Sequence, residues 1–452
     1  MTIHRSSESS SETLFGIRGC LIDCLEDPFL GSDDRSFHRS IRWFADGLLV
    51  IRSGKIIALG DYAKLVLDYP EIPITHYPDR LITPGLIDIH VHFPQTAIVA
   101  SYGSQLLEWL EKYTFPEERK FQDLDYAMQV ADLFLDELLR QGTTTAMVWA
   151  AVFPESVQAL FQAAKRRHLR LIAGKIMMDR NAPNYLLDTA EQGYRESRSL
   201  IEEWHGYDRL SYALTPRFAP TSTPAQLEMT RQLQAEFPSV YLQTHLSENV
   251  GELAWVKELF PDSKDYLEVY EQAGLVHDRS IFAHGIHLSE SEFSRLASAG
   301  SGLAFCPTSN LFLGSGLFKL HEAKSADRPI AVGLATDIGG GTSFSLLQTA
   351  NEAYKVLQLQ GQSLSAVQLL FLLTLGGARS LSLEDKIGNF EPGKEADLVV
   401  WNIQSNPIMA FRNAEPIQTW EILNDRLFSL LMMGDDRSVD SVYILGQRVD
   451  LN

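Results

Sequence analysis

The chain has 452 residues, with 39 Lys and Arg against 58 Asp and Glu, which gives a formal net charge of −19. Its length suits one large domain and a smaller one, and 45% hydrophobic residues is typical of a soluble globular protein. The acidic excess excludes a nucleic-acid polymer or an anionic membrane surface as an expected partner, because both are bound through clustered Lys and Arg.

The first residues of the chain lack the features of a targeting segment. Residues 1–12 are rich in Ser and Glu and contain no long apolar stretch, so we expect a flexible tail and no signal peptide. Three cysteines are too few for a disulfide framework, which indicates a reducing compartment. The longest apolar run, 146–153, is far shorter than the roughly 20 residues of a membrane span. We therefore expect a cytoplasmic protein without membrane contact.

Both ends of the chain have the composition of β-strands. Short aliphatic stretches separated by turn residues occur near each terminus, at 19–24, 47–60, 386–403 and 438–449. Strands at the two ends of a chain need partners for their exposed edges. We therefore predict that 13–82 and 386–452 together form one small, discontinuous β-sandwich domain.

The middle of the chain, 83–385, alternates strand and helix signals. Helical patterns at 116–140 and 154–168, and capping residues such as Thr223 and Ser289, separate the apolar stretches. The strand candidates are eight in number, near 85–91, 143–149, 170–178, 210–217, 240–246, 280–287, 301–306 and 330–336. This count and length predict an α/β fold with a (β/α)₈ TIM-type barrel. An open doubly wound sheet is the alternative, but no glycine-rich phosphate loop follows the first strand.

Polar residues follow the predicted strands at their carboxyl ends, where barrels of this kind carry their chemistry. They are His90 and His92 on the first strand, His245 and Glu248 on the fifth, His284 on the sixth and Asp337 on the eighth. Imidazole nitrogen and carboxylate oxygen are suitable ligands for Zn²⁺, with Fe²⁺ as the other candidate. We predict that one metal ion is bound by His90, His92, His245 and Asp337. A second metal would need a bridging group such as a carboxylated lysine, whereas the fourth strand ends in Arg217.

The remaining polar residues predict metal-assisted hydrolysis, since a bound divalent ion activates water. Glu248 lies three residues beyond a predicted ligand and suits the role of general acid and base. His284 is expected to orient the attacking water, and Asp337 to accept a hydrogen bond from it. Glu248, His284 and Asp337 are therefore the predicted catalytic residues, while Cys306 is expected to pack at the end of the seventh strand.

Several stretches resemble the guanine deaminases of the amidohydrolase superfamily, and the resemblance extends over nearly the whole chain. The most selective are HFPQ (92–95), PRFAP (216–220) and TDIGGGTSF (336–344), and THLSEN (244–249) is also similar. MDRNAPNYLLDT (178–189) and CPTSNLFLGSG (306–316) are similar as well. One departure is Phe93, where Tyr is equally expected, and it leaves one hydroxyl contact in doubt.

The resemblance implies the hydrolytic deamination of guanine, a purine base, to xanthine and ammonia by a zinc-dependent homodimer. It also implies that the base is contacted by Gln95, Arg217, Phe218, His92, His245, Glu248 and Asp337. Arg217 offers a planar set of donors to a purine carbonyl oxygen, Gln95 an amide, and Phe218 an aromatic face.

Three other functions stay open. A deaminase or dehalogenase of another amino-substituted heterocycle, a triazine or a different purine, would keep the metal ligands and change Gln95 and Arg217. A cyclic-amide hydrolase with two metals would need the lysine that the fourth strand lacks. A non-catalytic assembly protein with the same barrel would be expected to have lost ligands or the acid, and all of them are present.

Overall fold

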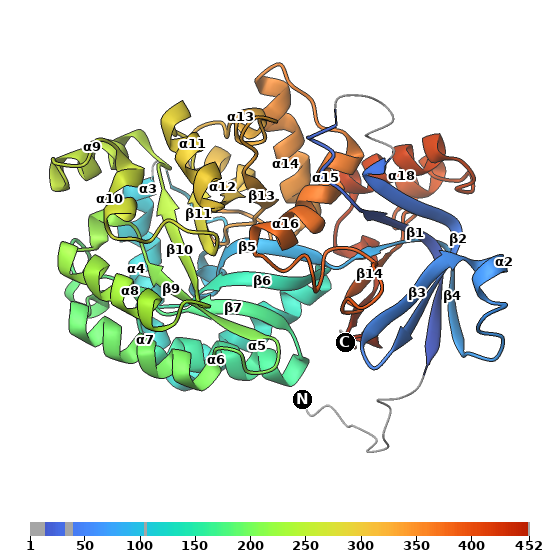
Figure 1. Cartoon of the computed structure of the whole chain (residues 1–452), viewed down its shortest axis with the longest axis horizontal. Coiled ribbons are helices and arrows are strands. Elements are labelled where there is room, and N and C mark those ends of the chain that lie inside the picture. Colours follow the sequence, from blue (N-terminus) through green and yellow to red (C-terminus); the bar gives the residue numbers. More distant parts are fainter. Residues whose placement is uncertain (1–13, 32–38, 104–105, 451–452) are drawn as a thin grey trace.

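A computed structural model describes residues 14–31, 39–103 and 106–450. The tail expected at 1–12 lies outside the described residues. Figure 1 shows a barrel with its surrounding helices on the left and a β domain on the right, to which both ends of the chain contribute. Among the described residues, no helix has both the length and the apolarity needed to cross a bilayer.

The barrel is built from eight parallel strands, and the α/β barrel prediction is confirmed. Its strands are β5 (Leu86–His92), β6 (Thr143–Trp149), β7 (Arg170–Gly174), β9 (Leu210–Pro216), β10 (Tyr241–Leu246), β11 (Ser280–His284), β12 (Gly302–Phe305) and β13 (Ala331–Leu334). They are hydrogen-bonded in this order. The third predicted strand is interrupted at Lys175, and its last part is the short β8 (Ile176–Met177), which pairs with β9.

The barrel closes between its first and last strands at the carboxyl end. The Asp337 backbone N–H donates to the His90 carbonyl at 2.9 Å, and the His92 N–H donates to the Ile338 carbonyl at 2.8 Å. These bonds bring the segment after β13 against the end of β5. Because both segments carry predicted ligands, the closure of the barrel also assembles part of the site.

Helices surround the barrel and cover its rim. The longer ones are α5 (Leu124–Arg140), α6 (Pro154–Arg167), α7 (Ala190–Trp204), α8 (Pro224–Glu236), α9 (Val250–Leu259), α10 (Tyr266–Gln272), α11 (Glu290–Ala299), α14 (Leu346–Leu359), α15 (Ala366–Leu373) and α18 (Trp420–Met433). The shorter helices are α2 (Tyr62–Leu65), α3 (Leu106–Trp109), α4 (Phe115–Glu118), α12 (Pro307–Phe312), α13 (Leu320–Ala323), α16 (Leu375–Ser380) and α17 (Pro407–Arg412).

Helix starts follow the capping residues that the sequence contains. The Ser289 hydroxyl and the Glu292 carboxylate form a reciprocal capping box at α11, and Thr223 accepts from the Gln226 N–H at the start of α8. The single helix expected at 116–140 is instead divided. The Asp123 side chain accepts from two backbone N–H groups and starts α5 anew, which separates it from α4.

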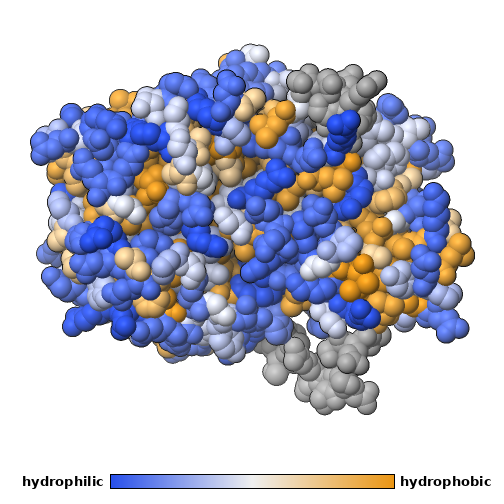
Figure 2. Space-filling view, in the orientation of Figure 1, coloured by the Kyte–Doolittle hydropathy of each residue, from blue (hydrophilic) through white to orange (hydrophobic). Residues whose placement is uncertain are grey.

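The β domain is one mixed sheet. Its strands, in hydrogen-bonded order, are β16 (Gln447–Arg448), β15 (Val439–Ile444), β14 (Leu398–Trp401), β4 (Ile74–Pro84), β1 (Phe15–Cys24), β2 (Ile41–Arg52) and β3 (Lys55–Asp61). Strand β4 pairs with β14 on one side and with β1 on the other. The strands that were expected to form the two sheets of a sandwich are therefore hydrogen-bonded into one continuous sheet. Figure 2 shows hydrophobic residues gathered over this domain, whereas the barrel side of the view is mostly hydrophilic.

Buried ion pairs connect the β domain to the amino-terminal end of the barrel. Arg170, the first residue of β7, donates from Nε to Glu395 Oε2 at 3.0 Å. Arg209 Nη2 lies 2.9 Å from the same carboxylate and also pairs with Asp397. This end of a barrel supports stability, which leaves the opposite rim for chemistry.

Candidate active site

Four imidazoles and one carboxylate meet at the carboxyl rim of the barrel. His90 and His92 extend from β5, His245 from β10 and His284 from β11, and Asp337 follows β13. The two histidines of β5 lie on the same side of the strand because strand side chains alternate. Their Nε2 atoms are 3.2 Å apart. Asp337 Oδ1 lies 3.1 Å from His90 Nε2 and 3.3 Å from His92 Nε2.

His245 turns its unprotonated ring nitrogen, Nε2, toward these residues. Its Nδ1 lies 2.8 Å from the Arg217 carbonyl oxygen, and because a carbonyl only accepts, Nδ1 carries the proton. The Nε2 lone pair of His245 is therefore free to bind a metal. The ring stacks on that of His92 at 5.3 Å between centroids. Possible ligand atoms of His90, His92 and His245 all lie within 4.8 Å of one another.

The charge states of these residues suit a divalent metal. Burial lowers the pKa of His90, lowers that of His92 to about 3, and lowers that of His245 well below its usual value, so the rings are neutral. Burial by itself would raise the pKa of Asp337, but the adjacent His90 and His92 hold it well below its ordinary range. Neutral nitrogen atoms and one ionised carboxylate are a donor set that fits Zn²⁺ or Fe²⁺.

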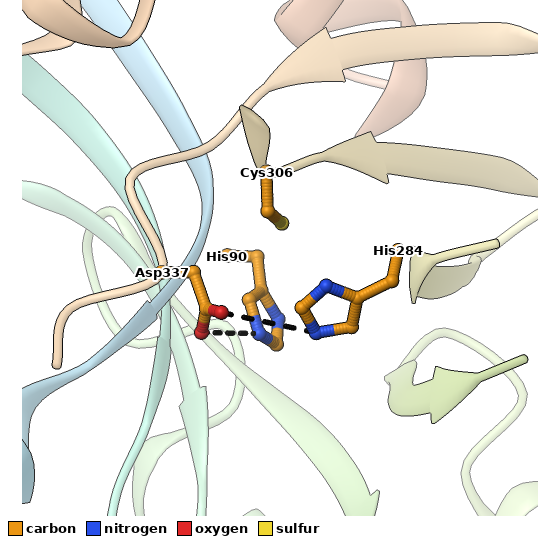
Figure 3. A group of neighbouring side chains, drawn as sticks. All are labelled: His90, His284, Cys306 and Asp337. Atoms are coloured by element: carbon orange, nitrogen blue, oxygen red, sulfur yellow. Dashed lines mark ion pairs between the residues drawn. The ribbon is translucent and has the colours of Figure 1, made fainter. Parts of the chain in front are cut away.

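Cys306 completes a second group of possible ligands with His90, His284 and Asp337 (Figure 3). Its Sγ lies 3.5 Å from the Ala304 carbonyl oxygen, to which it donates. Burial raises the pKa of the thiol well above its usual value, so the sulfur keeps its proton. Cys306 is a buried neighbour of the site that gives its S–H to the backbone.

His284 and Glu248 lie beside the proposed ligands. His284 Nε2 is 3.4 Å from Glu248 Oε2 and 3.8 Å from Asp337 Oδ2. Burial, with the negative charge of Asp337 as the second cause, raises the pKa of Glu248 to about 8. The raised pKa favours the protonated carboxyl group, which is the state that a proton donor needs.

Two partners of these residues have no assigned role in the sequence prediction. Asn310 Oδ1 lies 2.9 Å from His284 Nδ1, and the Ser315 hydroxyl donates to Glu248 Oε1 at 3.1 Å. Both belong to the CPTSNLFLGSG stretch, whose resemblance to the family was the only available signal. They fix the ring orientation of His284 and one oxygen of Glu248.

The backbone is constrained where these side chains leave it. His284 and Asp337 have φ angles of 71° and 50°, in the left-handed region that few residues other than glycine adopt. A Cβ atom at Gly341 would lie 1.8 Å from the Thr336 carbonyl oxygen, so the tight turn after Asp337 requires glycine. Non-glycine residues held in this region are typical of functional sites.

One pocket is lined by His92, His245, His284, Glu248 and Asp337 together with the predicted base contacts. Gln95, Arg217 and Phe218 line it, and all three are nearly fully buried. Its remaining wall is apolar and consists of Leu106, Trp109, Leu110 and Leu313. The sequence prediction did not include these four, because a short apolar helix looks the same in a core and in a pocket wall.

Gln95 and Arg217 share a buried partner. Arg217 Nη1 donates to both oxygens of Glu118, at 3.0 and 2.9 Å, and Gln95 Nε2 donates to one of them at 3.2 Å. Glu118 is fully buried in α4 and was not identified from the sequence. No local pattern could have identified it, since it lies 99 residues from Arg217.

Phe93 and the segment 178–189, to which the sequence assigned no role, lie away from the pocket lining. Phe93 packs against Phe121 and Phe134, with ring centroids at 4.9 and 5.8 Å, so a hydroxyl group there would be surrounded by aromatic carbon. In the 178–189 segment, Asn181 Nδ2 donates to the Pro220 carbonyl at 2.8 Å. The segment thus supports the backbone just after Phe218.

Comparisons with known proteins identify the family. Residues 81–449 match the model of the Amidohydrolase family. The chain is 49% identical to a guanine deaminase of Escherichia coli over 98% of this chain and 99% of the relative. A guanine deaminase structure from Bradyrhizobium japonicum is 39% identical, with a TM-score of 0.93 over 97% of this chain and 99% of its own. A guanine deaminase structure from C. acetobutylicum with bound guanine is 27% identical, with a TM-score of 0.87 over 97% and 100%. The chain therefore belongs to the amidohydrolase family, as its motifs indicated.

Proposed function

We propose that the protein hydrolyses guanine to xanthine and ammonia. The observation that carries the proposal is that one buried pocket joins a metal donor set, a protonated carboxyl group and a wall of hydrogen-bond donors. The relatives are guanine deaminases, which supports the same substrate.

We assign one metal ion to His90, His92, His245 and Asp337, with zinc as the expected element and iron as the alternative. Such an ion, when bound, supplies the Lewis acidity that lets water act as a nucleophile at neutral pH. Zinc is favoured by the nitrogen-rich donor set.

The residues of the chain then direct the protons. Glu248 donates its proton to the ring nitrogen beside the amino-bearing carbon as the water oxygen attacks that carbon. Asp337 Oδ2 and His284 Nε2 accept hydrogen bonds from the attacking water and orient it. Glu248 recovers a proton from the water and passes it to the amino group, the carbon–nitrogen bond breaks and ammonia leaves. The second proton of the former water leaves its oxygen as the carbonyl forms and returns to Glu248. Over the cycle, one water proton therefore replaces the proton given to the ring nitrogen and the other leaves on ammonia, so atoms and charges balance.

The opposite side of the pocket holds the base. Arg217 and Gln95 donate hydrogen bonds to its acceptors, and Phe218 packs on the ring. Leu106, Trp109 and Leu110 exclude bulk water, which strengthens these polar interactions.

Substrate identity is tested by incubating the purified, metal-assayed protein with guanine, adenine, cytosine and a triazine, and by following ammonia. We expect ammonia and xanthine from guanine and little release from the others. The absence of ammonia from guanine with metal bound would refute the proposal. Faster release from the triazine or another purine would favour the alternative heterocycle deaminase.

We also propose a cytoplasmic location and a homodimer. The location is supported by Cys20, Cys24 and Cys306, which are all buried and free of disulfides. The dimer rests on the family resemblance alone, and size-exclusion chromatography with light scattering tests it.

A further inference from the structure

The N–H groups of Gln95 and Arg217 form one side of the pocket, which we call the donor wall. One buried carboxylate lies directly behind this wall and takes no part in the proposed proton transfers. Glu118 is the last residue of α4 and is fully buried. A carboxylate without partners is costly in such a place, so its bonds to Arg217 and Gln95 are needed for its burial. The same bonds fix the positions of the two side chains that line the pocket.

The contacts of Gln95 determine which end of its amide group faces which partner. Oε1 lies 3.1 Å from the Gly339 backbone N–H, which only donates. Nε2 lies 3.2 Å from the Glu118 carboxylate, which only accepts. The donor at Gly339 and the acceptor at Glu118 therefore fix the orientation of the amide, and the second N–H of Nε2 stays available to the pocket.

Arg217 is held by the same carboxylate. Its Nη1 donates to both Glu118 oxygens, and its Cζ lies 5.6 Å from the centre of the Phe115 ring. In the described part of the chain, the guanidinium makes no further hydrogen bond, so Nε and Nη2 keep N–H groups for a ligand. This side of the pocket consequently offers donors from both residues.

We propose that Glu118 is a positioning residue that makes this wall a surface of donors and thereby selects bases with acceptors on the facing edge. A carbonyl oxygen or an unprotonated ring nitrogen satisfies the wall. An amino group on that edge of the base would face the N–H groups of Arg217 and Gln95. The donors on both sides would then be buried without acceptors, which disfavours binding. The selection of an oxopurine over an aminopurine thus depends on a residue that does not contact the base. The inference deepens the proposed function and rests on it.

The test compares Glu118→Gln with Glu117→Gln as a matched control. Glu117 is also buried, but it accepts from Lys120 and Tyr126. Among the described residues, the side-chain hydrogen bonds that Arg217 and Gln95 donate go to Glu118 and not to Glu117. For each variant, kcat and KM for guanine, bound metal, and the inhibition constants of hypoxanthine and purine are measured. Hypoxanthine carries the ring carbonyl and purine lacks it. The ratio of their inhibition constants therefore measures how strongly the donor wall binds the carbonyl.

We expect Glu118→Gln to raise KM for guanine and the inhibition constant of hypoxanthine by about tenfold to a hundredfold. The inhibition constant of purine should change by less than about threefold. Bound metal should be unchanged, because Glu118 bonds the side chain of Arg217, whereas His245 is held by the backbone carbonyl of Arg217. Glu117→Gln should keep the hypoxanthine-to-purine ratio of the unaltered protein.

Unchanged constants in Glu118→Gln, or an equal weakening of hypoxanthine and purine, would overturn the inference. If that variant does not fold, Glu118→Asp retains the charge but shortens the reach, and the same selective loss is expected of it. A metal-loaded, unaltered protein that releases no ammonia from guanine would instead refute the proposed function, so the two failures are distinguishable.

Discussion

Replacing Glu248 with glutamine removes a proton that the site holds while leaving its shape nearly unchanged. The side chain is 4% exposed, and Ser315 donates to Oε1 at 3.1 Å, a bond that the amide oxygen of glutamine can still accept. Burial and, after it, the charge of Asp337 raise the pKa of the carboxyl group to about 8. An amide has no proton to transfer at this pH, so the variant isolates the acid and base role of Glu248.

The expected loss follows from what a positioned proton donor contributes. General acid–base catalysis accelerates reactions by roughly 10²–10⁴, so kcat should fall by that factor, or about 3 to 5 kcal/mol of activation free energy. The assay is ammonia release at saturating guanine, with metal content and melting temperature as controls for the site and the fold. Ser315→Ala, which keeps the carboxyl group, should lose about tenfold. A Glu248→Gln enzyme with full metal and a rate within about tenfold of the unaltered protein would refute the assigned role.

Three further predictions concern the surroundings of the site. Asn310→Ala removes the acceptor of His284 Nδ1, 2.9 Å away, and should lower kcat by about 10- to 100-fold; an unchanged rate would show that the ring is oriented without it. Glu395→Ala leaves Arg170 without its buried partner and should lower the free energy of unfolding in urea by about 3–5 kcal/mol. Glu391→Ala, whose pair with Lys394 is half exposed, should cost at most about 1 kcal/mol, and equal losses would contradict this reasoning. Metal chelation should abolish activity and lower the melting temperature, and added Zn²⁺ should restore both; turnover by metal-free protein would argue against the metal site.

Much of the fold and of the site could be predicted because the signals are local. The barrel strands are short and largely apolar, and several carry polar residues at their carboxyl ends, as at His90 and His92 in β5. In the structure the predicted base contacts and three of the four predicted ligands line one pocket, and the fourth, His90, lies against Asp337. The division of the expected 116–140 helix at Asp123 was missed although its signal is local, since Asp123 caps the N–H groups of residues two and three positions along the chain. The single path of the β sheet was not predicted, because strand pairing depends on neighbours in space.

The sequence by itself determined the kind of chemistry. Parallel strands deliver their carboxyl ends to a common rim, so His245 on one strand and Asp337 after another are brought together by topology alone. Only the tertiary structure decided the state and orientation of these groups. The Arg217 carbonyl sets the tautomer of His245, burial keeps a proton on Glu248, and Glu118 fixes the donors of Arg217 and Gln95. Protonation and hydrogen-bond direction depend on desolvation and on partners distant in the chain, and no local pattern contains either.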